Sequence, residues 1–196
     1  GLVSADYYQA LTRPTVELVT DAIETVTAKG VKTADGTEHA CDVLIYGTGF
    51  ITTDFVSPAR ITGRGGRTIN EAWKDGAEAY LGITVAGFPN LFLLYGPNTN
   101  LGHNSIIFMI EAQVDYMVKA IQALKTRGAK ALDVKPEAFA RFNKQLQKDL
   151  TETAWAGSCS SWYKTASGKI TNNWSGDTKT YRRMAALPAL DDYELI

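Results

Sequence analysis

The sequence predicts an α/β fold, and three features carry this prediction. Two short apolar runs, residues 42–46 and residues 91–95, each lead into a glycine turn. Nearly continuous apolar runs of this length are typical of strands that are buried on both faces. Residues 105–127 instead carry apolar side chains at alternating intervals of three and four, which is the spacing of an amphipathic helix. Strands and a long helix of these kinds together indicate an α/β protein.

Short strands are also predicted in the first forty residues. Residues 16–20 and residues 23–28 alternate apolar and polar side chains, as half-buried strands do. The Asp35-Gly36 dipeptide is a strong hairpin turn signal, and β-compatible runs flank it at residues 30–33 and 37–39. We therefore expect a hairpin here.

The long helix has recognisable signals at both ends. Asn104 or Ser105 is suited to cap its N-terminus, and Gly128 is suited to stop it. At 1.5 Å per residue, residues 105–127 would extend roughly 34 Å, about the width of a domain. The predicted apolar stripe consists of Ile107, Ile110, Val114, Met117, Ile121 and Leu124.

A second helix is predicted to begin at Pro136, because proline favours the first helical position. We expect it to end near Gly157. The tail that follows, residues 158–196, mixes polar and aromatic side chains. The apolar face of this helix consists of Phe139, Phe142, Leu146 and Leu150.

The composition excludes several classes of protein. Among the 196 residues, 20 Lys and Arg stand against 21 Asp and Glu, so the formal net charge is −1. No global basic field therefore draws this chain to nucleic acid or to acidic lipid. Cys41 and Cys159 form no CxxC pair, so neither a disulfide framework nor a cysteine-rich zinc module is expected. With only two histidines, we also expect no multi-histidine metal site.

No segment is predicted to cross a membrane. The longest apolar stretch, residues 105–124, contains Glu111, Asp115 and Lys119, which are costly at the centre of a bilayer. Residues 1–9 do not combine a basic start with an apolar run, so we recognise no signal peptide. We therefore expect a cytoplasmic protein.

The segment between residue 95 and the long helix is the strongest candidate for a site. In α/β proteins, ligands bind beyond the carboxyl ends of strands, and a helix N-terminus presents unpaired N–H groups to an anion. This predicts a site for a phosphate or an anionic heteroaromatic ring. The alternative is that the asparagines of this segment only cap the helix and form turns. The candidate residues are Gly96, Pro97, Asn98, Thr99, Asn104, Ser105 and Ile106.

Other candidates have plain structural alternatives. The glycine pair at residues 47–49 is not a dinucleotide fingerprint, because the third small position would be Thr52; a turn with positive φ explains it as well. His103 is a candidate general base, although no nucleophile accompanies it. Trp162 and Trp174 are suited either to stack on a planar cofactor or to pack the tail. We expect Cys41 to be a small core residue.

Four segments, taken in order, resemble Baeyer–Villiger monooxygenases of the flavin-containing monooxygenase superfamily. Residues 42–50 resemble the strand and glycine turn that close the NADP domain, with Gly47 where the family usually has alanine. Residues 88–99 resemble the last strand of the FAD domain, and residues 104–111 resemble the start of the helix that faces the flavin. Residues 161–169 resemble the C-terminal tryptophan loop that reaches the nicotinamide cofactor.

The resemblance implies that this chain is the C-terminal portion of a flavoprotein with two dinucleotide-binding domains. Neither of the GxGxxG motifs of the family, nor its histidine-containing fingerprint, occurs in the sequence, and its catalytic arginine has no counterpart. On this basis, residues 1–50 are the end of the NADP-binding domain with a return linker. Residues 51–132 are the C-terminal part of the FAD-binding domain, and residues 133–196 are a C-terminal helix with an aromatic tail.

The function implied is that of an FAD- and NADPH-dependent monooxygenase, which inserts one oxygen atom of O2 into a ketone. Both cofactors need the missing N-terminal part, so we expect the chain alone to be inactive. No residue of the chain is assigned to catalysis or to a metal. The residues implied to bind cofactors are Gly47, Thr48, Gly49, Gly96, Pro97, Asn98, Thr99, Asn104, Ser105, Ile106 and Trp162.

Three alternatives stay open. The chain is also compatible with a non-catalytic module that associates with itself, because truncation exposes sheet edges and apolar faces. An enzyme that oxygenates nitrogen or sulfur would share the same motifs. Another flavoprotein with two dinucleotide-binding domains, such as a disulfide reductase, is disfavoured by the absence of a redox CxxC.

Overall fold

The computed structural model describes residues 4–157 and 161–196, and Cys159 lies outside them. The chain divides into two compact units, Gly1–Phe50 and Ile51–Ile196.

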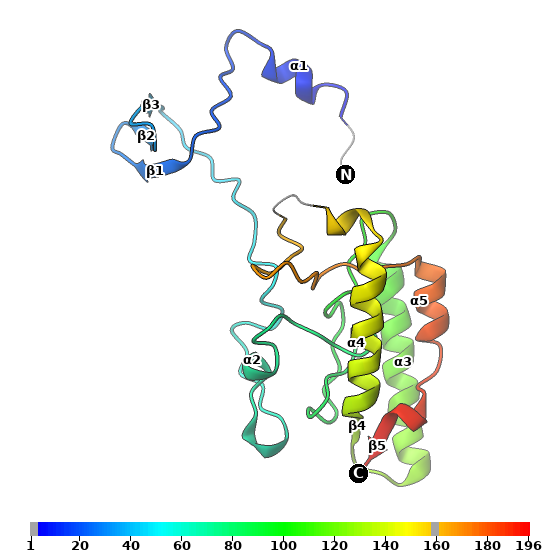
Figure 1. Cartoon of the computed structure of the whole chain (residues 1–196). Helices are drawn as coiled ribbons and strands as arrows, with labels where there is room; N and C mark the ends of the chain where they lie inside the picture. The colour runs from blue at the N-terminus through cyan, green and yellow to red at the C-terminus, as the bar shows by residue number, and fades with distance from the viewer. Residues whose placement is uncertain (1–3, 158–160) are drawn as a thin grey trace. The chain divides into compact units, whose positions relative to one another are not determined.

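The N-terminal unit contains a three-stranded antiparallel sheet (Figure 1). A short helix, α1 (Tyr7–Leu11), precedes the strands β1 (Ile23–Val26), β2 (Gly30–Thr33) and β3 (Glu38–Ala40). The predicted hairpin is confirmed, since β2 and β3 pair with Val31 opposite His39. The segment at residues 16–20 was predicted wrongly, because it forms no strand and is exposed to solvent.

The turn between β2 and β3 is organised by Asp35. Its Oδ1 accepts hydrogen bonds from the Thr33 hydroxyl at 2.6 Å and from the Thr37 backbone N–H at 3.1 Å. Its Oδ2 accepts one from the Thr37 hydroxyl at 2.7 Å. These donors stabilise the ionised carboxylate, the Thr33 hydroxyl most and Thr37 next, and lower the pKa of Asp35 to about 2.

The apolar run at residues 42–46 is not a strand in the structure. It has no regular secondary structure, and Val43 and Ile45 are 74% and 85% exposed. A strand with two apolar faces needs neighbours on both edges, and no described strand of the N-terminal unit lies beside it. Cys41 is also exposed, so the expectation of a core position was wrong.

The longer helices of the C-terminal unit form its frame (Figure 1). They are α3 (Ile106–Arg127), α4 (Pro136–Thr151) and α5 (Thr178–Met184). A two-stranded antiparallel sheet of β4 (Leu132–Val134) and β5 (Tyr193–Leu195) joins the sequence before α4 to the C-terminus. The short elements are η1 (Arg64–Gly66), α2 (Ile69–Ala72), η2 (Ala154–Ala156) and η3 (Leu190–Asp192).

Both predicted helices are confirmed, with one shift of a boundary. Ser105 occupies the N-cap position of α3, and Gly128 ends it in the left-handed conformation that favours glycine (φ 65°). Pro136 begins α4, as predicted, but the helix ends at Thr151 rather than near Gly157. The residues after Thr151 form a separate 3₁₀ turn.

The stripe predicted for α3 is not its buried face. The helix buries Met109, Ala112, Gln113, Tyr116, Ala120 and Leu124. Within the stripe only Leu124 is buried, whereas Ile107 is 64% exposed and Ile121 is 41% exposed. The face that packs is the one whose polar groups, on Gln113 and Tyr116, find hydrogen-bond partners on α5 and β5.

Hydrogen-bonded tyrosines join β5 to the core. The Tyr193 and Tyr116 hydroxyls lie 2.5 Å apart, and the Tyr193 hydroxyl is 3.0 Å from Thr84 Oγ1. Burial is the largest cause that raises the pKa of Tyr193, to about 12, so all three groups stay neutral. These bonds fix the C-terminus against α3.

The apolar run at residues 91–95 is also not a strand. Its side chains are half-buried or exposed, and Leu91 and Leu93 pack against a small apolar cluster around Ile69 and Phe88. Its ladder-like contact with the described residues is a single hydrogen bond from the Leu93 N–H to the Ile83 carbonyl at 2.8 Å. The run is therefore held by side-chain packing and by few backbone bonds.

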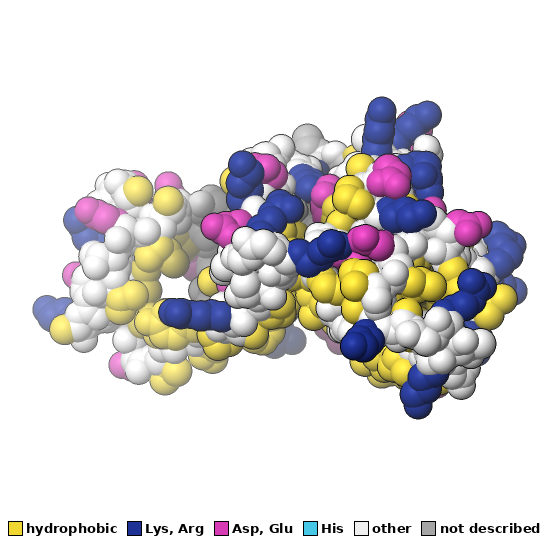
Figure 2. Space-filling view, turned by 90° about the horizontal axis from the view of Figure 1, so that it is seen from below, with side chains coloured by type: hydrophobic (Ala, Val, Ile, Leu, Met, Phe, Trp, Pro, Cys, Tyr) yellow, Lys and Arg dark blue, Asp and Glu magenta, His cyan; other side chains and the backbone are white. Residues whose placement is uncertain are grey.

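Charges of both signs are mixed with apolar side chains on the face shown in Figure 2. No helix among residues 4–157 and 161–196 is long and apolar enough to cross a membrane. In the same part of the chain, no group of three or more His, Cys, Asp or Glu side chains has the arrangement of a metal site.

Acid should weaken the hairpin through Asp35. The folded pKa of about 2 lies below the ordinary value of 3.8, so the stabilisation is complete above the ordinary value and is lost as the pH falls through about 2. We expect the amide signals of β2 and β3 to shift toward unfolded values in this window, as measured by NMR. Asp35→Asn should remove the dependence, and titration of Asp35 near its ordinary pKa would contradict the hydrogen-bonded turn.

Candidate functional site

A pocket of about 310 Å³ lies in the C-terminal unit. It is formed by residues that are far apart in the sequence, from three segments of the unit. Its lining combines aromatic rings with two side-chain amides and the hydroxyls of Thr52 and Tyr95, and it contains no charged side chain. The lining residues are Thr52, Phe55, Leu94, Tyr95, Gly96, Asn100, Trp162 and Asn172.

The loop after residue 95 approaches a second loop very closely. A Cβ atom at Gly96 would lie 2.3 Å from the carbonyl oxygen of Gly82, so only glycine fits there without movement of the backbone. Tyr95 and Asn98 have φ values of 57° and 58°, in the left-handed region. The loop is therefore tightly turned, and its conformation depends on contacts with other segments.

One such contact is a buried relay through Gln113 of α3. The Tyr95 N–H donates to Gln113 Oε1 at 2.8 Å, and Gln113 Nε2 donates to the Tyr181 hydroxyl at 2.9 Å. The Tyr181 hydroxyl donates to the Leu81 carbonyl at 2.6 Å. Gln113 and Tyr181 are fully buried, and burial raises the pKa of Tyr181 above its ordinary value. Each polar group of the relay is therefore satisfied within the core.

Asparagines join the same loop to the tail. The Asn100 N–H donates to the Asn172 carbonyl at 2.9 Å, and Asn100 Nδ2 donates to Asn173 Oδ1 at 2.8 Å. Asn98 Nδ2 donates to the backbone carbonyl of Asn173 at 3.0 Å and to that of Ile170 at 2.8 Å. The loop and the tail are thus held as one wall of the pocket.

Trp162 also lies in the tail and is 55% exposed. Its ring is 4.0 Å from that of Tyr163, with 35° between the planes. The Thr52 hydroxyl donates to its carbonyl at 2.5 Å, and Asn172 Nδ2 donates to the Thr52 carbonyl at 3.0 Å. An exposed indole that is supported by a second ring, and anchored through its backbone, is suited to contact a planar ligand.

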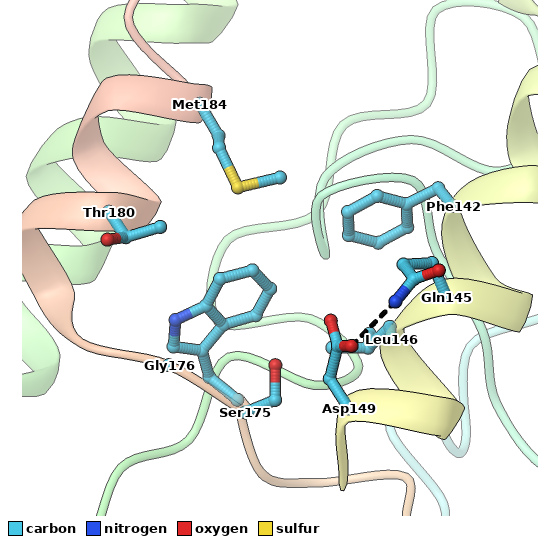
Figure 3. A pocket seen from close by; sticks show the side chains of 9 residues that line it. Phe142, Gln145, Leu146, Asp149, Ser175, Gly176, Thr180 and Met184 are labelled. Carbon is cyan, nitrogen blue, oxygen red and sulfur yellow. Dashed lines mark hydrogen bonds between the residues drawn. The ribbon is translucent and has the colours of Figure 1, made fainter.

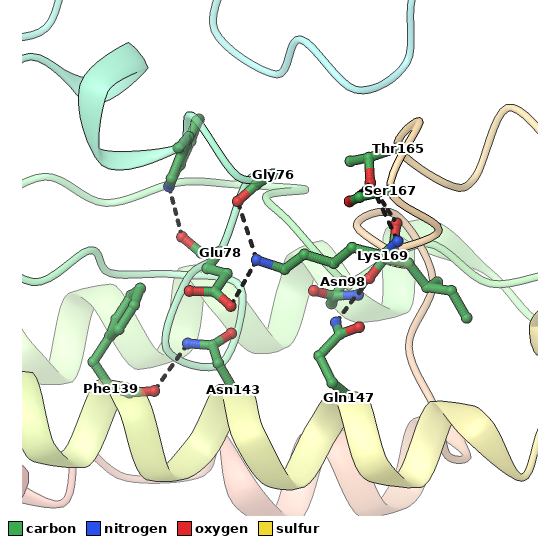
Figure 4. A network of polar contacts seen from close by, with 11 residues as sticks. Gly76, Glu78, Asn98, Phe139, Asn143, Gln147, Thr165, Ser167 and Lys169 are labelled. Carbon is green, nitrogen blue, oxygen red and sulfur yellow. Dashed lines mark hydrogen bonds and ion pairs between the residues drawn. The ribbon is translucent and has the colours of Figure 1, made fainter.

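A polar network holds the loop that carries Trp162 (Figure 4). Lys169 Nζ lies 2.8 Å from Glu78 Oε1 and 3.3 Å from the Gly76 carbonyl. Gln147 Nε2 of α4 donates to the Ile170 carbonyl at 2.9 Å. The base of the loop is therefore attached both to α4 and to the turn before Ala79, so that its position is set by tertiary contacts.

The structure brings only part of the predicted set together. Gly96 and Trp162 both line the pocket. Asn98 and Thr99 are buried, and their side chains bond to backbone carbonyls, with Thr99 Oγ1 donating to the Gly96 carbonyl at 2.7 Å. Pro97 is buried beside them. These hydrogen bonds agree with the turn-forming role, and a role of these residues in cofactor binding stays a prediction.

The N-terminus of α3 has no side-chain cap, and its first turn contains no acidic residue. Asn104 Oδ1 accepts from the Ser105 N–H at 2.7 Å, and Asn104 Nδ2 donates to Thr178 Oγ1 at 3.1 Å. Ile106 is half-buried. These three residues do not line the pocket, and the first backbone N–H groups of the helix have no side-chain acceptor at the N-cap.

The remaining candidates, the glycine turn at residues 47–49, Trp174 and His103, do not line the pocket. Gly47, Thr48 and Gly49 are exposed in the N-terminal unit, and their role stays a prediction. Trp174 is buried against Tyr181, and its indole N–H donates to the Asp177 carbonyl at 3.2 Å, so it packs the tail. His103 is exposed.

Thr52, Tyr95, Asn100 and Asn172 were not predicted as site residues. No local signal marks Thr52 or Asn172, because their roles arise from a contact across 120 residues of sequence. Asn100 and Tyr95 stand in or beside the segment that the sequence singled out. Asn100 lies within that segment, so a prediction that took every polar side chain of the segment would have included it.

Removing the Gln113 amide should destabilise the C-terminal unit. Gln113→Leu removes the acceptor of the part-buried Tyr95 N–H and the donor to the buried Tyr181 hydroxyl, which costs about 1–3 kcal/mol of unfolding free energy. Urea unfolding followed by circular dichroism measures this change. Gln122→Leu is the matched control, since Gln122 is an exposed glutamine on the same helix and should change stability little. Equal effects of the two substitutions would contradict the relay.

Curated relatives cover nearly all of this chain. A Baeyer–Villiger monooxygenase of Streptomyces coelicolor is 41% identical over 197 residues, which is 100% of this chain and 38% of the relative. The FAD-binding monooxygenase ktnD of Aspergillus niger is 44% identical over 187 residues, with 93% of this chain and 31% of the relative covered. A Baeyer–Villiger monooxygenase of Pseudomonas aeruginosa is 42% identical over 185 residues, covering 93% and 35%. The chain thus spans about a third of the length of these relatives.

Solved structures show the same relationship. A closed crystal structure of cyclohexanone monooxygenase matches with a TM-score of 0.83 and 31% identity, over 98% of this chain and 38% of that one. An oxidized steroid monooxygenase bound to NADP matches with a TM-score of 0.80 and 28% identity, over 97% of this chain and 37% of that one.

No protein-family model matches the chain. The α/β fold class that the sequence predicted, as part of a flavoprotein with two dinucleotide-binding domains, is nevertheless confirmed by the structural matches. Sequence and fold agree along almost the whole chain. The chain belongs to the Baeyer–Villiger-type flavin-dependent monooxygenases, and it corresponds to their C-terminal portion.

Proposed function

We propose that this chain contributes the C-terminal part of a monooxygenase that uses FAD and NADPH and inserts one oxygen atom of O2 into a ketone. The observation that carries the proposal is the pocket that Trp162, exposed and anchored through Thr52, lines together with the side-chain amides of Asn100 and Asn172. The relatives named above support this assignment of cofactors and reaction.

The residues present fit a planar, electron-rich cofactor. In the tilted Trp162–Tyr163 pair, Trp162 remains 55% exposed, and its indole therefore offers apolar area to a flat ring system. The N-terminus of α3 has free N–H groups and no acidic residue in its first turn, so it favours a negative charge. These two features are what a nicotinamide ring and the pyrimidine edge of a flavin need.

The cofactors supply the redox chemistry: NADPH provides the electrons, and FAD passes them to O2. The residues of this chain bind and orient. Ser105 and Ile106 begin the helix whose N–H groups stabilise negative charge by ~0.3–2 kcal/mol, as is typical of helix ends. Trp162 holds the nicotinamide or its ribose, and the tail acts as a gate. Gly47, Thr48 and Gly49 allow close approach of the backbone to a cofactor.

We assign the chain to three parts of that enzyme. Residues 1–50 are the end of the NADP-binding domain, residues 51–132 are the C-terminal part of the FAD-binding domain, and residues 133–196 are the C-terminal helix and tail. A cytoplasmic location stays a prediction.

Two other functions are separable by experiment. Exposed apolar side chains, among them Ile45 and Phe50 at 85% and 91% exposure, favour a module that associates with itself. Oxygenation of nitrogen or sulfur would use the same residues of this chain. Light scattering distinguishes the first alternative, and analysis of products distinguishes the second.

The flavin content tests the proposal directly. The 196-residue chain lacks both GxGxxG motifs, so we expect it to purify without colour. The complete gene product should purify yellow and should convert a cyclic ketone to its lactone with one ¹⁸O atom from ¹⁸O2. Stoichiometric flavin on the chain alone, or a sulfoxide as the sole product from a mixture of a ketone and a thioether, would contradict the proposal.

Trp162 should contribute to the binding of NADPH. In the complete enzyme, Trp162→Ala should raise KM for NADPH by roughly 2- to 10-fold, because the stacked contact is lost. Trp162→Phe keeps a ring and should be closer to the parent enzyme. Because Trp162 is more than half exposed, neither substitution should lower the melting temperature appreciably. An unchanged KM in Trp162→Ala would remove this residue from the cofactor site.

A further inference from the structure

A second pocket, of about 280 Å³, lies between α4 and α5, and its lining shares no residue with the pocket around Trp162. Figure 3 shows Phe142 of α4 and Met184 of α5 projecting toward one another across it, with Asp149 and Ser175 at another side. Leu146 and the buried Trp174 complete its apolar part. Its volume is close to the lower limit for pockets that hold small organic ligands.

The pocket has one formal charge, the carboxylate of Asp149. Gln145 Nε2 donates to Asp149 Oδ1 at 2.7 Å, and Oδ2 has no hydrogen bond to the described residues. Among those residues no Lys or Arg forms an ion pair with Asp149. The spacing along α4 explains this: Phe142, Leu146 and Asp149 share one helix face, whereas Lys144 and Lys148 stand on others.

The charges near Thr180, on the α5 side, offset one another. Arg183 Nη2 lies 3.5 Å from the Thr180 hydroxyl, which donates to Asp177 Oδ2 at 2.9 Å. Arg183 does not line the pocket. The unbalanced charge that faces the pocket is therefore negative.

We propose that this pocket binds a small organic ammonium ion that carries an aromatic or alkyl group. The apolar group would be buried against Leu146 and Met184, and the faces of Phe142 and Trp174 would attract the cation. An ammonium N–H would donate to the free oxygen of Asp149 as a charge-assisted hydrogen bond. A neutral apolar ligand of the same shape would gain only the first of these contributions and would withdraw the carboxylate from water.

The test compares two probes of nearly the same shape, 2-phenylethylammonium and 2-phenylethanol, on the 196-residue chain at neutral pH. Isothermal titration gives their dissociation constants. The ¹³C-methyl signal of Met184 reports the place of binding, because the chain has only three methionines and Met184→Leu identifies the signal. We expect the ammonium ion to bind roughly tenfold more tightly than the alcohol and to shift the Met184 signal.

Variants separate the contribution of the carboxylate from a general change in the fold. Asp149→Asn keeps the shape of an exposed side chain and should remove the tenfold preference, whereas Glu137→Gln, an exposed carboxylate on the same helix, should leave it unchanged. Met184→Lys, at a position that is 42% exposed, places a like charge in the opposite wall and should abolish ammonium binding. Equal affinity for the two probes, a preference that survives in Asp149→Asn, or binding without a shift of Met184 would each overturn the proposal.

Discussion

The candidate site depends on one buried side chain, Gln113, which bonds in two directions at once. Its oxygen accepts from the backbone of the loop after residue 95, and its nitrogen donates to Tyr181 on α5, which in turn donates to the Leu81 carbonyl. A side-chain amide suits this place because it carries a donor and an acceptor on one rigid group. Both hydrogen bonds are needed, because the free-energy cost of leaving a buried amide group unsatisfied exceeds the net stabilisation by one hydrogen bond. The loop, α3 and α5 are therefore positioned together.

The two faces of α3 show what determines burial in this protein. Val114 and Ile121 are exposed, while Gln113 on the adjacent face is fully buried. Hydrophobic side chains alone do not select the packed face; the tyrosine-rich elements α5 and β5 pack where their hydroxyls find partners. The exposed apolar residues of α3 and of residues 43–51 leave large apolar areas in contact with water. This distribution is expected of a chain that spans about a third of the length of its relatives.

The two pockets of the C-terminal unit differ in chemistry as well as in place. The pocket around Trp162 is lined by neutral amides and a half-exposed indole and holds no charged side chain. The pocket between α4 and α5 has an apolar wall and one carboxylate. The tail contributes to both, through Trp162 and Asn172 in one case and through Trp174 in the other. The tail thus lines both pockets, and the contacts of Lys169 with Glu78 and of Gln147 with the Ile170 carbonyl attach residues 169–170 to the rest of the unit.

The sequence by itself determined the local elements: the Asp35 turn, the ends of α3 and the start of α4 follow from turn chemistry, capping and proline, which act within a few residues. The motifs also identified the family, because their order along the chain is specific. Tertiary structure decided the rest. The run at residues 42–46 has strand composition, but no described strand of its unit lies beside it. Asn98 turns inward to carbonyls of the tail, and Thr99 to the Gly96 carbonyl of its own loop. Thr52 meets Asn172 across 120 residues, a pairing that no local pattern encodes, because only the packing of the chain brings such distant residues within hydrogen-bond distance.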